Sequence, residues 1–269
     1  MIELGGARSM FVDLTNLNGL FRASEKVKPD LVVHTAALTD VELCEREPAL
    51  AHHVNAELAK NVASACNCLG IKLVHISTDH LFDGGKAFCT EVDAVCPVNV
   101  YGRTKALAEE FVMDACKEAL IIRTNFYGWG SSYRSSFTDR IYKSLSARKE
   151  TKLPEYVHFT PIIVDELVSA VHSLISYGES GIFNVTGRDR ISKYQFGKYF
   201  SSVFNFDADL VVPSQNSVRE LKVARPMDMS LSNAKLDERI RKNISSLGDG
   251  LERLKRQASF GIPEELLNI

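Results

Sequence analysis

The chain has 269 residues and carries 32 Lys and Arg against 34 Asp and Glu, which leaves a formal net charge of −2. Apolar residues make up 45% and charged residues 25%, so the composition excludes a mainly disordered chain. The sequence shows no basic excess for nucleic-acid binding, no apolar stretch near the roughly 20 residues that cross a bilayer, and no secretory signal in MIELGGARSM. We expect a cytoplasmic protein without nucleic-acid or membrane partners.

Six cysteines, all in the first half of the chain, fit that compartment. They show no CxxC spacing, and the one close pair, Cys66 and Cys68, lies in a stretch with a helical pattern. Residues two apart on a helix point to different faces, so this pair is poorly placed to share a metal ion. We expect reduced thiols, with no disulfide and no metal, at Cys44, Cys66, Cys68, Cys89, Cys96 and Cys116.

The first half alternates short apolar runs with helical patterns. In chain order these predict a strand at 31–37, a helix at 47–69 that ends at Gly70, a strand at 71–78, a helix at 99–116 and a strand at 119–124. Strands that alternate with helices at this spacing form a parallel sheet with right-handed crossovers. The pattern therefore predicts an α/β fold with a doubly wound parallel (Rossmann-type) sheet, whose ligands lie at the carboxyl ends of the strands.

The second half has a more mixed pattern. It predicts helices at 135–148 and 164–177, a strand at 181–187, and a helix that begins after Ser192, whose hydroxyl is suited to cap it. No linker or low-complexity stretch separates the two halves. We therefore predict a Rossmann-type domain at 1–145 and a small C-terminal lobe at 146–269, packed together and partly interleaved.

Polar side chains follow the strand predicted at 71–78. Thr78 and Asp79 lie at its carboxyl end, and Tyr101 and Lys105 follow in the run NVYGRTKALAEEF. Positions i and i+4 share a helix face, so the phenol and the ammonium are able to act on one ligand. A nearby cation favours the phenolate, so we expect Lys105 to lower the pKa of Tyr101. Such a tyrosine passes a proton to a carbonyl oxygen while a hydride reaches the carbon, and Thr78 is placed to supply a second hydrogen bond.

The Tyr-x-x-x-Lys spacing is weak evidence by itself because it occurs twice, the second time at Tyr194 and Lys198. Context separates the two copies. Tyr101 follows a strand that ends in Ser-Thr-Asp and precedes another buried strand, whereas Tyr194 has no polar strand end at a comparable spacing. We therefore assign the catalytic role to Tyr101 and a structural role to Tyr194.

Several stretches resemble the extended short-chain dehydrogenase/reductases. HISTDHLFDG, PVNVYGRTKALAEE and IIRTNFYG are similar to the patterns STDYVFDG, NxYGxTK and RTSW of the dTDP-4-dehydrorhamnose reductase-like (sugar-nucleotide reductase) branch. The similarity continues in KPDLVVHTAALTDVELCEREP, GIFNVTG and ARPMDMSLSNAKL, so it covers nearly the whole chain. It implies an NAD(P)-dependent reductase of a nucleotide-linked keto sugar. NADPH or NADH would bind to the first domain and the sugar nucleotide to the second lobe. A homodimer is a possible assembly.

The resemblance also implies roles for individual residues. The catalytic residues are Thr78, Tyr101 and Lys105, with Tyr101 as the acid/base and Lys105 also on the nicotinamide ribose. Cofactor contacts fall on Asp13, Leu14, Ala37, Leu38, Thr39, Ile76, Tyr101 and Lys105. Substrate contacts fall on Thr78, Asp79, Phe126 and Arg225. No metal site is implied, and we interpret His34, His52, His53 and His75 as structural because they match no catalytic position.

The main departure from the family concerns the cofactor. The family opens with a strand and a Gly-x-x-Gly-x-x-Gly turn, whose backbone holds the pyrophosphate at a helix N-terminus. None of the sixteen glycines here makes that pattern, and Gly5-Gly6 stands where the family has reached its second strand. We expect that roughly 25–30 residues, the usual size of one β-α unit, are missing in front of Met1. The chain as it stands is then expected to bind a dinucleotide weakly.

Two other departures bear on the substrate: His80 replaces the usual tyrosine after STD, and the segment between Gly130 and Thr160 is shorter and less regular than in the family. Two alternative functions therefore stay open. A sugar-nucleotide epimerase or dehydratase has the same fold and recycles its cofactor. A non-catalytic subunit, similar to the regulatory subunit of methionine adenosyltransferase, fits the missing glycine turn, whereas the Tyr101 and Lys105 pair favours an enzyme.

Overall fold

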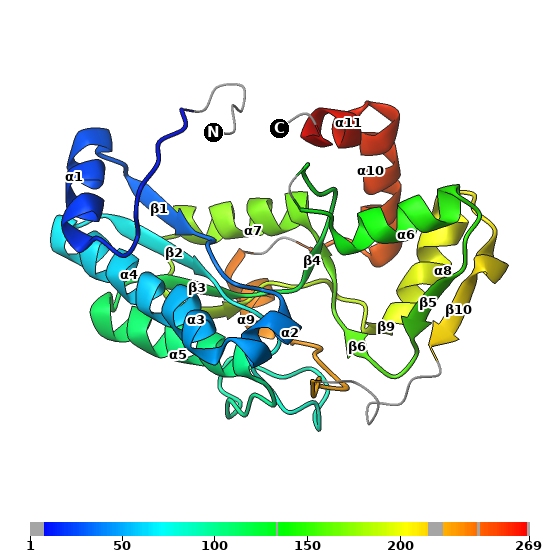
Figure 1. Ribbon diagram of the computed structural model, residues 1–269, viewed down its shortest axis with the longest axis horizontal. Coiled ribbons are helices and arrows are strands. Elements are labelled where there is room, and N and C mark those ends of the chain that lie inside the picture. Colours follow the sequence, from blue (N-terminus) through cyan, green and yellow to red (C-terminus); the bar gives the residue numbers. More distant parts are fainter. Residues whose placement is uncertain (1–7, 133, 215–222, 241–242, 268–269) are drawn as a thin grey trace.

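The structure, a computed structural model, describes residues 8–132, 134–214, 223–240 and 243–267, so Gly5-Gly6 lies outside the described residues. A four-stranded parallel sheet in the order β1-β2-β3-β8 forms its centre (Figure 1). The four strands are β1 (Leu31–His34), β2 (Lys72–Ile76), β3 (Leu120–Arg123) and β8 (Gly181–Asn184). Because all four run in parallel, their carboxyl ends meet at one edge, where ligands of this fold class bind.

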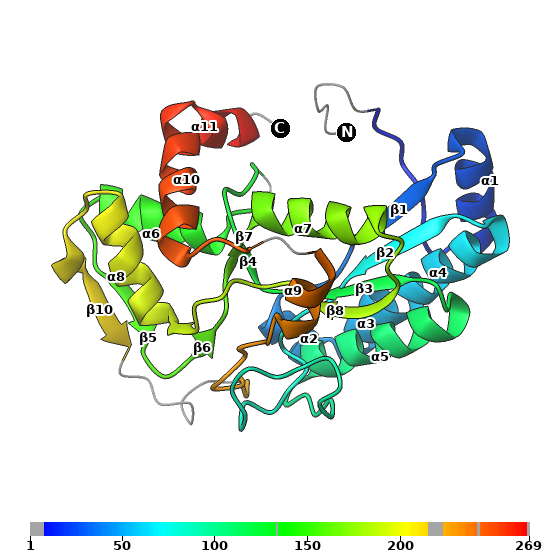
Figure 2. The ribbon, with the colours of Figure 1, turned by 180° about the vertical axis from the view of Figure 1, so that it is seen from behind.

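Helices cover both faces of this sheet (Figures 1 and 2). One face carries α1 (Leu17–Val27), α4 (Leu58–Leu69) and α5 (Val100–Ala115), and the other carries α7 (Val164–Ser176) and α9 (Ala234–Ile240). Alternate strand residues enter the two cores: Leu73 and Ile121 pack with α4 and α5, while Val74 and Ile122 pack with α7 and α9. This arrangement confirms the predicted α/β fold with a doubly wound parallel sheet.

The predicted helix at 47–69 forms as three consecutive helical segments. They are α3 (Pro48–His52), a π-helical turn (His53–Glu57) and α4, and the short helix α2 (Val41–Arg46) precedes them. Gly70 ends α4 with a left-handed φ of 66°, as expected of a C-capping glycine. The π turn holds Asn55, which is 1% exposed, and π turns often occur where a buried side chain has a special role.

The remaining elements build a smaller lobe beside the sheet (Figure 1). Its three short strand pairs are β5 (Thr151–Pro154) with β10 (Val211–Ser214), β4 (Phe126–Tyr127) with β7 (Ile162–Ile163), and β6 (His158–Phe159) with β9 (Ile191–Ser192). Its helices are α6 (Phe137–Ser146), α8 (Lys193–Val203), α10 (Leu247–Ser259) and α11 (Ile262–Leu267), with a 3-10 turn at Ala208–Leu210. Ser192 caps α8 through a capping box with Gln195, as predicted.

Aromatic side chains fill the core of this lobe. Phe196 is fully buried, with its ring 5.2 Å from that of Tyr127 and 5.4 Å from that of Phe137. Aromatic pairs at these separations contribute about 0.5–1.5 kcal/mol each beyond the burial of their area. The lobe therefore has a hydrophobic core of its own, which holds α6 and α8 against the strand β4 that leads out of the sheet.

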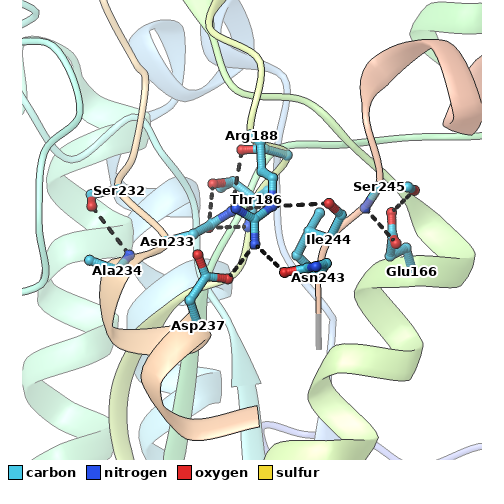
Figure 3. Close-up of polar contacts among 11 residues, drawn as sticks. Glu166, Thr186, Arg188, Ser232, Asn233, Ala234, Asp237, Asn243, Ile244 and Ser245 are labelled. Carbon is cyan, nitrogen blue, oxygen red and sulfur yellow. Dashed lines mark hydrogen bonds and ion pairs between the residues drawn. The ribbon is translucent and has the colours of Figure 1, made fainter. Parts of the chain in front are cut away.

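A polar network anchors the C-terminal segment to the sheet (Figure 3). Arg188, which follows β8, donates to the Asp237 carboxylate at 2.9 Å and to the Ile244 carbonyl at 3.0 Å. Glu166 on α7 accepts from the Ser245 backbone at 2.9 Å and from its hydroxyl at 2.6 Å. These bonds connect α7, α9 and the start of α10, so the two lobes share one scaffold.

One edge of the sheet is open in the described part of the chain. There β1 pairs with β2 on one side, and no described strand lies on the other. Met10, Val12, Val27, Val32 and Val33 line an apolar groove of about 270 Å³ along this edge, and Val33 is 49% exposed. Because unpaired strand edges with apolar side chains favour edge-to-edge association, this groove is the expected site of self-association.

Introducing a charge at the open edge tests this expectation. Val33→Lys is expected to reduce self-association at high protein concentration, because a lysine on an edge strand opposes pairing with another chain. Light scattering coupled to size-exclusion chromatography measures the effect. Val168→Lys is the matched control, since Val168 is 62% exposed on α7, away from the edge. Equal effects of the two substitutions would contradict the assignment.

Candidate active site

The carboxyl ends of β2 and β3 bring the expected catalytic residues together. Thr78 and Asp79 directly follow β2 and are 5% and 1% exposed, and Asn125 follows β3. Tyr101 and Lys105 lie in the first turns of α5, where the Asn99 side chain caps the helix by accepting from the Gly102 amide at 2.8 Å. The sequence-predicted group Thr78, Tyr101 and Lys105 therefore meets at one end of the sheet.

Close contact between α5 and the loop after β2 requires a glycine. A Cβ on Gly102 would lie 2.4 Å from the His80 carbonyl oxygen and 2.8 Å from a Pro97 side-chain carbon. Any larger residue would push the helix away from the loop. The glycine thus sets the distance at which Tyr101, one residue earlier, faces Thr78 and His80.

Tyr101 is buried against α2 and α3, in a cluster with Val41, Cys44 and Ala51. The His80 ring meets the Tyr101 ring edge-on at 5.4 Å. Burial raises the pKa of Tyr101 to about 12, although the Thr78 hydroxyl lies close enough to favour the phenolate in part. The expectation that Lys105 lowers this pKa is wrong for this structure. Desolvation outweighs the attraction of any cation near the phenol.

The orientation of Lys105 explains this outcome. Its ammonium donates to the Ile76 carbonyl oxygen at 2.8 Å and lies 3.3 Å from Nε2 of His75. The side chain is 2% exposed, and burial lowers its pKa to about 8, with Glu109 opposing that shift. The ammonium of Lys105 is therefore held by two groups of β2. It points to them and does not stabilise the phenolate of Tyr101.

Asp79 is the most buried carboxylate of the site. Its Oδ2 accepts from Nδ2 of Asn125 at 2.5 Å, and its Oδ1 accepts from the Thr78 hydroxyl at 3.3 Å. Burial raises the pKa of Asp79 to about 6, while the Asn125 bond and the charge of Lys193 oppose the shift. At neutral pH the site thus holds a carboxylate close to its titration range.

Two basic groups, His80 in the loop after β2 and Lys193, lie close to that carboxylate, and Arg225 lies near both of them. Burial, together with the nearby charges of Lys193 and Arg225, lowers the pKa of His80 to about 3, so this imidazole is neutral. Burial also lowers the pKa of Lys193, which lies at the start of α8. Arg225 pairs with Glu42 on α2, while its Nε is buried without a partner in the described residues. Lys193 and Arg225 therefore bring positive charge close to His80 at this end of the sheet.

The residues expected at the cofactor lie along the β1 loop and the sheet edge. Asn55 holds Leu38 in place, accepting from its amide at 2.7 Å and donating to its carbonyl at 3.1 Å. Thr39 accepts from Arg134 of the smaller lobe, and Leu14 lines the apolar groove, whereas Asp13 is exposed and binds Thr15. Ala37 is half-buried in the same loop, and Ile76 contacts Lys105 through its carbonyl.

The described residues fit only part of a bound dinucleotide. Tyr101, Lys105 and the loop of Leu38 and Thr39 suit the nicotinamide ribose end. Residues 35–47 after β1 contain no glycine, so no glycine turn approaches a pyrophosphate there. The groups at this end of the sheet thus match the chemistry of a nicotinamide ribose, and the loop after β1 offers no glycine turn for the phosphates.

Four residues that contact the predicted site residues were not identified from the sequence. Asn125, Lys193 and Asn55 all contact predicted site residues, and His75 contacts Lys105, although His75 was interpreted as structural. The position of Asn125 directly after the strand at 119–124 was the one available signal. Phe126 is 52% exposed at β4, next to Asn125, where a ligand face is accessible.

The second Tyr-x-x-x-Lys copy has a structural role. Lys198 donates to the Ala208 carbonyl at 2.7 Å and lies 5.6 Å from the Tyr194 ring, which packs on the aromatic core. All six cysteines are free thiols in the structure. Within the described ranges no cluster of three or more His, Cys, Asp and Glu side chains is arranged for a metal ion, and no helix is long and apolar enough to cross a bilayer.

A doubly wound parallel sheet with a buried Thr, Tyr and Lys at its carboxyl edge defines an extended short-chain dehydrogenase/reductase fold. Residues 2–259 match the RmlD substrate binding domain family. The chain belongs to this family, which confirms the resemblance seen in the sequence.

Similarities to individual proteins support this assignment. The chain is 29% identical over 248 residues to the probable low-salt glycan biosynthesis reductase Agl14 of Haloferax volcanii, covering 91% of this chain and 83% of that protein. It is 40% identical over 124 residues to the dTDP-4-dehydrorhamnose reductase of Salmonella typhimurium, an alignment of 45% of this chain and 42% of that protein. The structure of the Bacillus anthracis dTDP-4-dehydrorhamnose reductase in complex with NADP superimposes with a TM-score of 0.85 at 29% identity, covering 91% and 87% of the two chains.

Replacing Asp79 by asparagine should stabilise the protein in a pH-dependent way. The pKa of Asp79 rises on folding from 3.8 to about 6, so the folded state keeps a proton that the unfolded chain releases, and the carboxylate opposes folding as the pH rises through this window. Asp79→Asn removes that opposition. We expect a gain of at most about 3 kcal/mol in the free energy of unfolding at about pH 8, which shrinks towards zero at about pH 4.

Urea unfolding at both pH values measures this difference. Asp114→Asn, at a carboxylate whose side chain is 81% exposed, is the control and should leave the pH dependence unchanged. A wild-type protein that becomes more stable as the pH rises, with Asp79→Asn showing no gain, would contradict the assigned protonation of Asp79.

Proposed function

We propose that this protein is an NAD(P)-dependent reductase of a nucleotide-linked keto sugar, similar to dTDP-4-dehydrorhamnose reductase. One observation carries the proposal: Tyr101 is a buried, protonated phenol between Thr78 and His80, at the carboxyl edge of the sheet and one helical turn before Lys105. The named relatives are reductases, and they support this function over an epimerase, a dehydratase or a non-catalytic subunit.

The protonation of the site suits the reductive direction. A carbonyl oxygen that becomes a hydroxyl must gain a proton, and the Tyr101 phenol carries a proton at neutral pH. Thr78 adds a hydroxyl at the same position, where a second hydrogen bond stabilises the developing charge on the oxygen. When bound, the nicotinamide supplies the hydride, and the NADP complex of the similar structure favours NADPH over NADH.

The charges around the site support a phosphorylated substrate. Lys193 and Arg225 lie near His80 and Asp79, and Arg140 is close enough to Lys193 to lower its pKa. Cations that converge on one cleft attract the diphosphate of a nucleotide sugar. Phe126, exposed beside Asn125, is available to stack on a flat ring. We therefore place the nucleotide sugar between β4 and the start of α8. The helix belongs to the lobe proposed to span 146–269, and β4 lies next to that lobe.

Removing the phenolic hydroxyl tests the proposed chemistry. Tyr101→Phe should reduce the rate of NADPH oxidation with a dTDP-4-keto sugar by about 10²–10⁴-fold, the usual contribution of a positioned acid. Tyr194→Phe is the matched control, because it removes the same hydroxyl from the second copy of the motif and should retain wild-type activity. Spectrophotometric NADPH oxidation measures both.

Three outcomes would sink the reductase proposal. The first is no turnover by the wild-type chain with any of a panel of such sugars, although the sugars bind. The second is product formation without net consumption of NADPH, which indicates an epimerase or dehydratase. The third is an equal loss of activity in Tyr101→Phe and Tyr194→Phe, which indicates damage to the fold.

The affinity for NADPH tests independently whether the described residues fit only the nicotinamide end of the cofactor. Because the described residues provide the nicotinamide end and no glycine cradle, isothermal titration should show NADPH binding weaker than micromolar. Lys105→Met should weaken it further, whereas Lys198→Met, in the second motif, should not. Micromolar affinity of the 269-residue chain would show that other backbone amides hold the pyrophosphate.

The cysteines bear on the cellular compartment of the proposed reaction. Six free cysteines suit a reducing compartment, so we place the protein in the cytoplasm, where NADPH is available. A homodimer remains a prediction, and light scattering on the protein at increasing concentration measures it.

A further inference from the structure

Two histidines stand behind Lys105, on the side away from the substrate cleft. His75 in β2 and His34 in β1 are register partners in the sheet, so their side chains point to the same face. Their rings stack with centroids 5.3 Å apart and planes at 23°. The side chains are buried, at 1% exposure for His75 and 6% for His34.

The contact with Lys105 defines the tautomer of His75. An ammonium group has three donors and no acceptor, so the nitrogen that lies 3.3 Å from Nζ, Nε2 of His75, has to accept. His75 is then neutral, with its proton on Nδ1. A protonated His75 would place two donors and two positive charges together in the core, which is strongly unfavourable.

The surroundings keep the two imidazoles neutral. Burial, and after it the charge of Lys105, hold the pKa of His34 at about 4 and that of His75 well below its usual range. On α5 the other charged group near Lys105 is Glu109, whose carboxylate is bound by Arg123 of β3 at 2.7 Å and by the Ser77 hydroxyl at 2.5 Å. Lys105 therefore has no anion of its own, and the ring of His75 and the Ile76 carbonyl are its polar partners in the described residues.

We propose that His75 is a positioning residue, which holds Lys105 against β2 by accepting one of its ammonium protons while the Ile76 carbonyl accepts a second. The third proton is left to point into the cleft, where the cofactor ribose and Tyr101 lie under the proposed function, on which this role depends. His34 stacks on the far side of His75 as a neutral ring and keeps a second cation away from it. His75 and His34 thus fix the orientation of the Lys105 ammonium towards its ligand.

The titration of Lys105 tests the role without any enzymatic assay. The ε-methylene signals of lysine follow its ionisation by NMR, and Lys105→Met assigns the signal of Lys105 in the full chain. In His75→Leu the ammonium loses an acceptor while the site stays apolar, so the pKa of Lys105 should fall by about 1 pH unit. In His75→Gln the amide oxygen lies where Nε2 was, and the wild-type pKa should return.

A purely structural role would give a different result. His75→Leu and His75→Gln would then both lower the melting temperature and leave the pKa of Lys105 unchanged, which would overturn the proposal. His53→Leu is the control, because His53 is an exposed histidine bound to Glu57 on the π turn and should change neither quantity. Circular dichroism of each variant establishes that the fold is retained before its titration is compared.

The activity arm separates this role from the proposed function. If the chain reduces a dTDP-4-keto sugar, His75→Leu should lower kcat/KM by about tenfold and shift the basic limb of its pH profile, with recovery in His75→Gln. Wild-type activity in His75→Leu would overturn the positioning role and leave the reductase standing. If the wild-type chain has no reductase activity, the proposed function fails, and the Lys105 titration still decides whether His75 positions the lysine.

Discussion

Desolvation of ionisable groups at the carboxyl edge of the sheet governs the chemistry of this protein. Tyr101, Asp79, His75 and His80 are all displaced towards their neutral forms, because each lies among strand ends with too few partners to replace water. Lys105 follows the same rule, since no carboxylate faces it directly. At neutral pH the Tyr101 phenol therefore keeps its proton and the two imidazoles are neutral, while Asp79 and Lys105 titrate closer to neutral pH than they do in water.

This arrangement is maintained by close packing around the site. Gly102 lets α5 approach the loop after β2, the π turn brings Asn55 to the Leu38 backbone, and Asn125 reaches back to Asp79. The Asn55 and Asn125 contacts satisfy polar groups that, if buried without a partner, would cost about 1–3 kcal/mol each. The loop after β2 is thus held by Asn125 and by the close approach of α5 at Gly102, and the loop after β1 by Asn55, before any ligand binds.

The two lobes meet through charge as well as through apolar packing. Arg134 and Arg225 belong to the part of the chain after β3, and they bind Thr39 and Glu42 in the segment after β1. Lys193 at the start of α8 faces Asp79 at the end of β2. Under the proposed function, the cations that join the lobes are also the ones placed to meet the phosphates of a nucleotide sugar.

Local patterns determined the four strands of the central sheet, the helices at 47–69, 99–116, 135–148 and 164–177, the helix after Ser192, and the pair Tyr101 and Lys105, because apolar periodicity and i to i+4 spacing are properties of short stretches. The same patterns did not show that 151–154 pairs with 211–214, since strand partners so far apart are chosen by three-dimensional packing. The predicted helix at 47–69 contains a π turn at 53–57 for a similar reason: Asn55 binds Leu38, seventeen residues earlier. The helices α1, α2, α9 and α11 were not predicted, nor were the short strands of the smaller lobe.

By itself, the sequence determined the fold class, the family resemblance and the catalytic motif with its order along the chain. Tertiary structure alone decided the protonation of that motif. From the i to i+4 spacing, Lys105 was expected to stabilise the phenolate of Tyr101, but the ammonium instead lies against Ile76 and His75 while α2 and α3 bury the phenol. The spacing places two side chains on one helix face, whereas their pKa values depend on every element that excludes water from them.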